Sequence, residues 1–347
     1  MKPADFLRAR VHALWQKRGP LSTALLPFSW ITGVVVRRRK RRALAQPAPP
    51  SALPTVVVGN LVVGGTGKTP VVIAIAHKLR ALGWTPGIVS RGYGANLGAD
   101  PRTGQGLLDA AEFGDEPALI ARATGAPVAV HPQRSRARQA LAQRFPDVDV
   151  VISDDGLQHL ALSRDVEIVV QDARGVGNGR LLPAGPLREP AAKLAEVDFI
   201  VDNGGPFNDA PSTRRPERIA MRLQPTSAEH LAGGTRLAWP DWVARHRNTP
   251  LAAVAAIGQP ARFFDTLRNA GLRLERTMAL PDHDAYRQPP FTALEQELIA
   301  VTAKDAVKCG RFADPRVWAV HVEASFSDPS WLDRLAEMLS DAAAQRH

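Results

Sequence analysis

The fold of this chain is decided by residues 55–70, which read Thr55-Val-Val-Val-Gly-Asn-Leu-Val-Val-Gly-Gly-Thr-Gly-Lys-Thr-Pro70. A β-branched strand leads into a glycine-rich turn, a Gly-Lys-Thr triplet and an apolar helical run at residues 71–82. This order is typical of a phosphate-binding loop between a strand and a helix. Glycines let backbone N–H groups close around a polyphosphate, and the helix N-terminus adds the positive end of its dipole. The loop therefore predicts that the chain binds ATP or GTP.

Two side chains of this loop are candidates for direct contact with the nucleotide and its metal. We expect Lys68 to reach the β- and γ-phosphates and the Thr69 hydroxyl to ligate Mg²⁺. Pro70 fits the first helical turn, where no backbone N–H is needed. The usual spacing has a glycine at position 62, where this chain has Val62. A glycine-rich turn before a helix is often only a turn, so the prediction rests on Gly67-Lys68-Thr69 following a hydrophobic strand.

Length, cysteine content and charge limit the possible functions. A chain of 347 residues is long enough for two domains, and its single cysteine, Cys309, excludes a disulfide framework within it and fits a reducing compartment. The net charge of +10 comes entirely from residues 1–50, because the remaining residues contain equal numbers of basic and acidic side chains. A nucleic-acid enzyme more often spreads basic charge over its body, so we expect no nucleic-acid partner.

The basic N-terminal region also contains apolar segments. Residues 4–18 place four apolar side chains on one helical face, namely Leu7, Val11, Leu14 and Trp15. Residues 21–36 are mostly apolar and precede the basic run Arg37-Arg-Arg-Lys-Arg-Arg42. As a helix the apolar part is about 24 Å long, short of the roughly 30 Å hydrocarbon core, and Pro27 interrupts it. We therefore expect residues 1–42 to lie in an anionic membrane surface.

Two other interpretations of this region are available. A secretory signal peptide would use Ala43-Leu-Ala45 as its cleavage site, but six basic residues between that site and the apolar stretch contradict the layout of a signal peptide. The other interpretation is an ordinary helix packed on the core, next to a solvated basic run.

The middle of the chain alternates apolar strands with helical runs, which predicts a doubly wound, parallel α/β sheet. Strands are expected at residues 86–90, 126–130, 148–153 and 166–170. Ligands of such sheets gather at the carboxyl ends of the strands. Because Asp154 and Asp155 follow an apolar strand, we expect a carboxylate that holds Mg²⁺ beside the loop. The alternative is a simple turn formed by Asp-Asp-Gly.

Three further polar motifs have both a structural and a functional interpretation. In Gly114-Asp-Glu-Pro117, either acidic residue could simply cap the helical run at residues 118–123. Residues 182–190 form a proline-stiffened loop that could be plain surface. A single histidine such as His283 is more often structural than catalytic.

The pattern loosens from about residue 204, and a second α/β unit follows. Its strands are expected at residues 252–257, 298–301 and 317–322, and its helices at residues 263–270 and 331–344. We expect four regions: an N-terminal membrane-association segment at 1–46, a phosphate-binding core at 47–222, a linker at 223–248 and a smaller C-terminal α/β domain at 249–347.

Together, these motifs resemble those of the tetraacyldisaccharide 4′-kinases, the lipid A 4′-kinases of Gram-negative bacteria. The matching motifs run in order along the chain: Gly59-Asn60, Gly64-Gly-Thr-Gly-Lys-Thr-Pro70, Ser90-Arg-Gly-Tyr93, Gly114-Asp-Glu-Pro117, Asp154-Asp-Gly-Leu-Gln-His159, Leu182-Pro-Ala-Gly-Pro-Leu-Arg-Glu189, Pro281-Asp-His283 and Thr302-Ala-Lys-Asp-Ala-Val-Lys308. The family's own loop lacks the first glycine, so Val62 fits the pattern. Where the family often has two adjacent histidines, this chain has His283-Asp284, so only His283 is carried over.

The resemblance implies a P-loop kinase-like core with a second, smaller α/β/α domain that closes over the site. It implies transfer of the ATP γ-phosphate to the 4′-hydroxyl of an acylated glucosamine disaccharide 1-phosphate, tetraacyldisaccharide 1-phosphate. This acceptor is a lipid, which accounts for a basic and apolar N-terminus and places the enzyme at the cytoplasmic face of the bacterial inner membrane.

The resemblance also assigns roles to residues. It implies that Asp115, assisted by His283, takes the proton of the acceptor hydroxyl, while Lys68 stabilises phosphoryl charge. The residues that bind ATP would be Asn60, Gly64, Gly65, Thr66, Gly67, Lys68, Thr69 and Arg188. The residues that hold Mg²⁺ would be Thr69, Glu116, Asp154 and Asp155. The residues that line the acceptor site would be Tyr93, Gln158, His159 and Glu189.

Two other classes of protein carry part of this pattern. A membrane-recruited ATPase switch of the partitioning or cell-division type also has Gly-Gly-x-Gly-Lys-Thr, but with a signature lysine where this chain has Val63. A non-catalytic nucleotide-binding scaffold would leave Gly114-Asp-Glu-Pro117 unexplained. Phosphorylation of the acylated disaccharide would support the kinase, whereas hydrolysis without acceptor that responds to a protein partner would support the switch.

Overall fold

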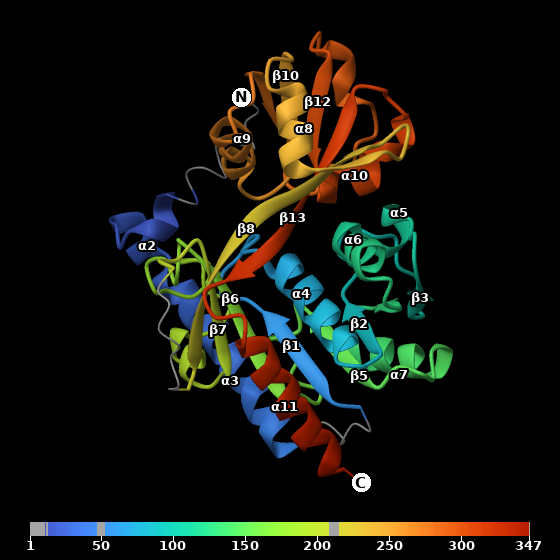
Figure 1. Cartoon of the computed structure of the whole chain (residues 1–347). Helices are drawn as coiled ribbons and strands as arrows, with labels where there is room; N and C mark the ends of the chain where they lie inside the picture. The colour runs from blue at the N-terminus through green and yellow to red at the C-terminus, as the bar shows by residue number, and fades with distance from the viewer. Residues whose placement is uncertain (1–10, 12, 47–52, 208–214, 347) are drawn as a thin grey trace.

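The computed structural model describes residue 11 and residues 13–46, 53–207 and 215–346 (Figure 1). The chain forms a larger lobe, at the bottom of Figure 1, and a smaller lobe at the top, joined by two long strands. Leu7 and its neighbours up to residue 10, expected on an amphipathic helix, lie outside the described residues.

One sheet runs through both lobes. Within the described residues its strand order is β11-β10-β12-β13-β8-β7-β6-β1-β5-β2-β4-β3, and β9 pairs with β8. The strands of the larger lobe are β1 (Thr55–Gly59), β2 (Pro86–Ser90), β3 (Arg102–Gly104), β4 (Val128–Val130), β5 (Val150–Asp154), β6 (Val166–Asp172) and β7 (Phe199–Asn203). From β4 to β7 all neighbours are parallel, and β1 lies between β5 and β6. The predicted α/β fold class, with a doubly wound parallel sheet, is therefore confirmed.

Helices cover both faces of this part of the sheet, which is why its strands are apolar throughout. The helices of the larger lobe are α4 (Lys68–Ala81), α5 (Ala110–Phe113), α6 (Asp115–Thr124), α7 (Arg134–Arg144) and the 3₁₀-helix η1 (Ala191–Ala195). Alternate side chains of β1 point to opposite faces. Val56 and Val58 join the core that contains Ile75 of α4, whereas Val57 packs with Leu157 on the other side.

The smaller lobe repeats the three-layer arrangement on a smaller scale. Its elements are α8 (Trp239–His246), β10 (Leu251–Ala255), α9 (Pro260–Asn269), β11 (Leu274–Ala279), η2 (Pro290–Ala293), β12 (Leu298–Thr302), α10 (Ala303–Cys309) and η3 (Gly310–Phe312). One apolar cluster lies on each face of its sheet, one around Trp242 and Phe264, the other around Phe291 and Ile299.

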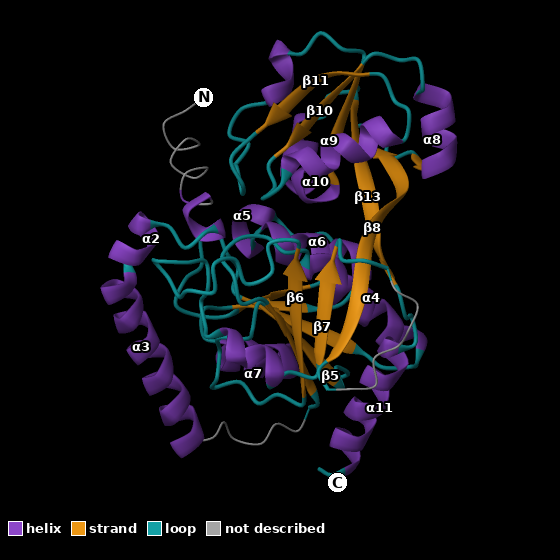
Figure 2. Cartoon of the chain, turned by 90° about the vertical axis from the view of Figure 1, so that its left-hand side faces the viewer, coloured by secondary structure: helices purple, strands orange, loops and turns teal. Residues whose placement is uncertain are grey.

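The structure differs from the expected layout in the region between the lobes. Residues 223–248, expected as a linker, form the second half of β8 (Glu217–His230), then β9 (Arg236–Ala238) and α8. Strand β8 pairs with β13 (Val317–Phe326) in antiparallel fashion, and Figure 2 shows this pair running from one lobe to the other. The two lobes are therefore connected by hydrogen-bonded strands and not by an irregular segment.

The last helix also lies in an unexpected place. The sequence pattern predicts helix α11 (Trp331–Ala344) in the C-terminal domain, but Trp331, Leu335 and Leu339 pack into the core of the larger lobe. The apolar periodicity of a helix shows which face is buried, but it does not show which surface covers that face.

The N-terminal region forms two consecutive helices, α2 (Pro20–Ala24) and α3 (Leu26–Ala45), beside the larger lobe (Figures 1 and 2). Pro27 lies in the first turn of α3, where proline is tolerated, so the helix breaks before it at Leu25. The basic run Arg37 to Arg42 is part of α3. No helix in the described part of the chain is long and apolar enough to cross a membrane.

Candidate active site

The glycine-rich loop joins β1 to α4, and its backbone requires glycine at two positions. Gly64 and Gly67 have φ values of 98° and 97°, in the left-handed region that favours glycine. A Cβ atom on Gly67 would lie 2.5 Å from Nδ2 of Asn203, so close packing also requires glycine there. Helix α4 begins at Lys68, directly after the loop, so the N-terminus of the helix points toward the loop. The loop thus has the backbone shape of an anion site.

Asp154, the last residue of β5, and Asp155, which follows it, lie beside this loop at the carboxyl end of the parallel strands. Lys68 Nζ is 3.5 Å from Asp155 Oδ1, and Arg188 Nη1 is 3.1 Å from Asp155 Oδ2. Burial raises the pKa of Asp155, but the positive charges of Lys68 and Arg188 outweigh it and lower that pKa to about 2. Asp154 accepts a hydrogen bond from Ser90 Oγ (3.0 Å), and its burial and the charge of Glu116 raise its pKa to about 7.

Asp115 lies at the first residue of α6 and faces the smaller lobe. Its carboxylate is contacted from that lobe by His283 Nδ1 (3.1 Å) and by Lys308 Nζ (2.8 Å). Burial raises the pKa of Asp115, but the hydrogen bonds from His283 and Lys308 outweigh it and hold the pKa below its ordinary value. The N-cap of α6 is Gly114, and no side chain caps the helix, so Asp115 does not have the capping role that its sequence position also allowed.

Glu116 makes the second contact between α6 and the smaller lobe. Lys304 Nζ is 3.0 Å from Glu116 Oε1 and 3.4 Å from His283 Nε2. Burial raises the pKa of Glu116, but the charges of Lys304 and Lys68 outweigh it and lower the pKa. Two lysines, one at the end of the loop and one from α10, therefore favour the ionised form of Glu116.

The four residues expected at the acceptor site have different environments. Gln158 Nε2 donates to Glu189 Oε1 (2.9 Å), and Arg188 Nη1 donates to Gln158 Oε1 (3.2 Å), so these residues are joined to Asp155 through Arg188. The Tyr93 ring meets the His283 imidazole edge-on, with ring centroids 5.0 Å apart. Burial and the charges of Arg134 and Arg91 lower the pKa of His159 to about 4, so this histidine is neutral. Its backbone carbonyl accepts a hydrogen bond from Arg164 Nη2 (2.6 Å).

Sequence reasoning missed several residues of this region. Lys304 and Lys308 belong to the motif Thr302-Ala-Lys-Asp-Ala-Val-Lys308, and their i, i+4 spacing on a helix predicts that they share one face. Asn203 and Asp172 each end an apolar parallel strand, as Asp154 does. This position in the sequence indicates a residue near the ligand site, because ligands gather at the carboxyl ends of such strands. Arg174 had no such signal for its contact with the loop, because its partners there are backbone carbonyls of residues more than 100 positions away.

Comparison with known proteins identifies the family of the chain. A family model described as "Tetraacyldisaccharide-1-P 4'-kinase" matches residues 21–340. A tetraacyldisaccharide 4′-kinase of Bordetella parapertussis is 58% identical over 337 residues, which cover 96% of this chain and 97% of that protein. One of Vibrio cholerae is 43% identical over 340 residues, covering 95% and 97%. The chain belongs to the tetraacyldisaccharide 4′-kinase family.

A solved structure agrees with this assignment. A crystal structure of LpxK from Aquifex aeolicus in complex with ATP matches with a TM-score of 0.78 and 25% sequence identity, over 93% of this chain and 99% of that one. The chain is therefore a lipid A 4′-kinase with a P-loop kinase-like fold, and the ATPase-switch alternative is not favoured.

Proposed function

We propose that this 4′-kinase transfers the ATP γ-phosphate at the boundary between the two lobes, with Asp115 as the proton acceptor. The acceptor 4′-oxygen attacks the γ-phosphorus while the bond to the β–γ bridging oxygen breaks, ADP leaves, and the hydroxyl proton passes to Asp115. The observation that carries this proposal is the buried Asp115 carboxylate, which His283 of the other lobe contacts at 3.1 Å. A carboxylate with a lowered pKa is ionised at neutral pH and can accept that proton.

The loop and its neighbours would hold the nucleotide. Backbone N–H groups from Gly64 to Thr69 would contact the β- and γ-phosphates, and Lys68 would stabilise the charge that develops on the transferred group. Arg188 lies within reach of the same region because it shares Asp155 with Lys68. Asn60 shapes the loop, since its Nδ2 donates to Gly64 O (2.9 Å).

The oxygen atoms around the loop fit a magnesium ion. Asp154 Oδ1 and Thr66 Oγ1 are buried without a hydrogen-bond partner, which costs about 1–3 kcal/mol per group unless a ligand satisfies it. No group of three or more His, Cys, Asp or Glu side chains in the described residues forms a complete metal site. Mg²⁺ does not need such a complete site, because it is usually bound by one or two carboxylates together with phosphate oxygens and water.

Four residues are the proposed holders of this ion: Thr69, Asp154, Asp155 and Glu116. Mg²⁺, when bound, would neutralise charge on the β- and γ-phosphates. Asp155 and Glu116 are ion-paired with Lys68 and Lys304 in this structure. We expect both ion pairs to break when nucleotide and metal bind together, so that the carboxylates contact the metal ion.

The acceptor headgroup would contact Tyr93, Gln158, His159 and Glu189, of which Tyr93 lies beside the Asp115–His283 pair. Tyr93 is 63% exposed and its ring meets the His283 ring edge-on, so its exposed surface is available to cover a sugar ring. Gln158 Nε2 also donates to Asn60 O (3.2 Å), so the Glu189 carboxylate is the group of this pair that can accept a hydrogen bond from a sugar hydroxyl.

A lipid-phosphorylation assay tests the proposed site. The protein is incubated with ATP, Mg²⁺ and tetraacyldisaccharide 1-phosphate in detergent, and the position of the new phosphate is determined by mass spectrometry and ³¹P NMR. We expect Asp115→Ala to abolish most 4′-phosphorylation, and the matched variant Asp109→Ala to retain it, because Asp109 only caps the short helix α5. Equal activity of the two variants would contradict the role of Asp115.

We also propose that α2 and α3 bring the enzyme to an anionic membrane surface, the cytoplasmic face of the inner membrane. Large apolar side chains on these helices face solvent, including Phe28 (58% exposed), Trp30 (69%) and Ile31 (55%). Burying such a side chain contributes about 1.5–3 kcal/mol. The opposite side of the helices is fixed to the larger lobe, where Ser22 Oγ donates to Ala184 O (2.6 Å) and Ser29 Oγ donates to Leu181 O (2.8 Å).

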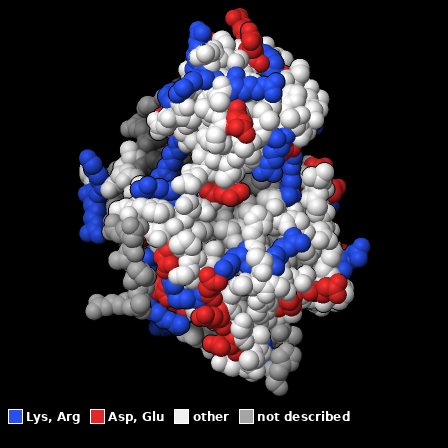
Figure 3. All heavy atoms as spheres, viewed as in Figure 1, with Lys and Arg blue, Asp and Glu red and all other residues white. Residues whose placement is uncertain are grey.

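The distribution of charge supports this orientation. Every residue from Arg37 to Arg42 is exposed on α3. Figure 3 shows charges of both signs interspersed over the two lobes, in keeping with the balanced charge of residues 51–347. The excess positive charge is therefore concentrated on the segment that also exposes apolar side chains, which is the combination that anionic lipid surfaces attract.

A further inference from the structure

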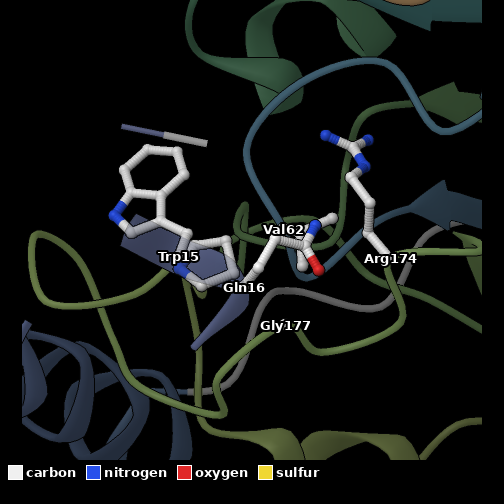
Figure 4. Close-up of a pocket in the computed structure, with 6 residues that line it drawn as sticks. Trp15, Gln16, Val62, Arg174 and Gly177 are labelled. Carbon is white, nitrogen blue, oxygen red and sulfur yellow. The ribbon is translucent and has the colours of Figure 1, made fainter. Parts of the chain in front are cut away.

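Arg174 lies against the outer, carbonyl side of the glycine-rich loop. Its Nη2 donates to Gly65 O (2.9 Å) and its Nη1 lies 3.3 Å from Val63 O. Figure 4 shows the extended Arg174 side chain on the wall of a small cavity that Val62 and Gly177 also line. A Cβ atom on Gly64 would lie 3.2 Å from Arg174 Nη1, so the guanidinium packs directly on the loop.

These contacts complete a set in which side chains hold four consecutive loop carbonyls. Arg174 holds those of Val63 and Gly65, Asn60 holds that of Gly64 (2.9 Å), and Asn203 holds that of Thr66 (3.0 Å). A trans peptide is planar, so its N–H points opposite to its C=O. Fixing the carbonyls on the outside therefore turns the N–H groups of the next residues, Gly64 to Gly67, to the inside. Arg174 alone orients two of these four peptide units.

A buried carboxylate fixes the guanidinium in turn. Arg174 Nε donates to both oxygens of Asp172, at 2.9 and 3.0 Å, and the Asp172 side chain is 1% exposed at the end of β6. The same carboxylate accepts a hydrogen bond from Nε2 of Gln259, at 2.7 Å. Gln259 precedes α9 and belongs to the smaller lobe. The loop is thus linked to the smaller lobe through two side chains of the larger one.

A second contact joins the smaller lobe to the loop at the same place. Gly258, next to Gln259, lies so near the loop that a Cβ on it would be 3.6 Å from Gly65 N. The turn between β10 and α9 therefore packs directly on the loop, next to the peptide unit that Arg174 orients.

We propose that Arg174 is a positioning residue for ATP, which presets the loop N–H groups for the phosphates, and that Asp172 and Gln259 couple this preset shape to the position of the smaller lobe. The proposal rests on the proposed binding of ATP phosphates by this loop. Glycine-rich segments are the most flexible in the unbound state, so a residue that orders two peptide units before binding increases affinity without contacting the ligand.

Arg174→Ala tests the proposal, with Arg218→Ala as the matched control. Arg218 forms the same kind of pair with Asp202 (3.1 and 3.2 Å) at the next strands of the sheet, and its contacts do not include the loop. For the full-length protein in detergent we expect Arg174→Ala to raise the Kd for ATP, measured by calorimetry, and the KM for ATP at least tenfold. The KM for the lipid should match that of Arg218→Ala, and the Kd is measured well below the melting temperature, which we expect to fall because Arg174→Ala removes the positive partner of the buried Asp172 carboxylate. Arg174→Lys should recover little, because an ammonium group cannot reach Asp172 and two carbonyls in one plane.

Lys68→Ala separates failure of this proposal from failure of the ATP-loop assignment. If Lys68→Ala loses ATP affinity while Arg174→Ala binds ATP as the Arg218→Ala control does, the positioning role is wrong and the assignment stands. If neither variant changes the Kd, the loop does not bind ATP and both proposals are overturned.

The Gln259 link has its own test. Gln259→Ala should raise the Kd for ATP by a smaller factor than Arg174→Ala. It should cause no further loss of ATP affinity when combined with Arg174→Ala, because both residues act through the Asp172 carboxylate. Independent, multiplicative losses would overturn the coupling between the loop and the smaller lobe.

Discussion

At the scale of single residues, Asp115 depends on a partner that comes from a distant part of the sequence. The 3.1 Å contact with His283 crosses between the lobes, so the two side chains are expected to act as a unit. We expect Asp115→Ala and His283→Ala each to lower kcat by about 10²–10⁴-fold with little change in ATP affinity. The double variant should be clearly less impaired than the product of the single losses. Strictly multiplicative effects in the lipid assay would show that the two residues act independently.

We expect Asp154, one of the proposed holders of Mg²⁺, to make metal binding depend on pH. Its pKa is raised to about 7 by burial and the charge of Glu116, so Mg²⁺ must displace a proton to bind below that pH. We expect Mg²⁺ affinity in the presence of a non-hydrolysable ATP analogue to weaken by up to about tenfold per pH unit as the pH falls below 7, and to level off above it. Isothermal titration in buffers of different ionisation enthalpy measures both the affinity and the released proton.

The control for this experiment is Asp154→Asn. The ATP γ-phosphate titrates in a similar pH range and also makes Mg²⁺ affinity depend on pH. The difference between wild type and the variant gives the part of this pH dependence that Asp154 causes. If wild type and Asp154→Asn show the same pH dependence, Asp154 does not hold the ion.

At the scale of elements, substitutions on the exposed face of α3 can test the proposed membrane function without disturbing the fold. Lys40 pairs with Glu196 of the larger lobe at 2.6 Å, so it is left unchanged, and the five exposed arginines Arg37, Arg38, Arg39, Arg41 and Arg42 are replaced by Gln. Each basic residue near an anionic surface contributes about 1 kcal/mol. We expect binding to anionic vesicles to fall strongly and to lose most of its salt dependence, whereas the Kd for ATP stays the same.

The matched control removes the same charge from other surfaces of the protein. It replaces five exposed arginines with Gln, namely Arg136, Arg144, Arg245, Arg268 and Arg273. Co-sedimentation with vesicles that contain anionic or only neutral lipids compares the two variants. Equal loss in both would show that net charge, and not α3, brings the protein to the membrane.

At the scale of the whole molecule, two lysines of α10 connect the lobes through buried or half-buried ion pairs. Lys304 pairs with Glu116 and Lys308 with Asp115, and both side chains are at least four-fifths buried, at 17% and 10% exposure. Removing one partner of a buried ion pair destabilises a protein more than removing one partner of a surface pair, because the remaining charge is buried and unpaired. We therefore expect Lys308→Met to lower kcat about 10–100-fold and to increase the separation of the lobes, measured by small-angle X-ray scattering.

Lys193→Met is the control, since Lys193 pairs with Glu167 within the larger lobe and with similar burial. That variant should keep the scattering profile and most of the activity. An unchanged profile for Lys308→Met would show that the ion pair does not hold the lobes together.

The sequence determined the local chemistry of the larger lobe. The strand, glycine turn and helix of residues 55–82 could be identified because φ-permissive glycines, a β-branched run and a helix start are all properties of adjacent residues. The same reasoning placed Asp154 and Asp155 at the end of a strand, where parallel sheets gather their ligands. Resemblance to a family then supplied Asp115 and His283, which composition alone would have left as a helix cap and a structural histidine.

Only the tertiary structure decided how these pieces meet. The pairing of β8 with β13, the packing of α11 on the larger lobe, the contact of Arg174 with the glycine-rich loop and the ion pairs of Lys304 and Lys308 with α6 join parts of the chain that are far apart in sequence. No local pattern fixes such pairings, because an apolar face or a charged side chain specifies what kind of partner it needs but not which one. The sequence by itself therefore determined the phosphate-binding loop and the class of fold, and the folded chain decided which lysines and which arginine complete the site.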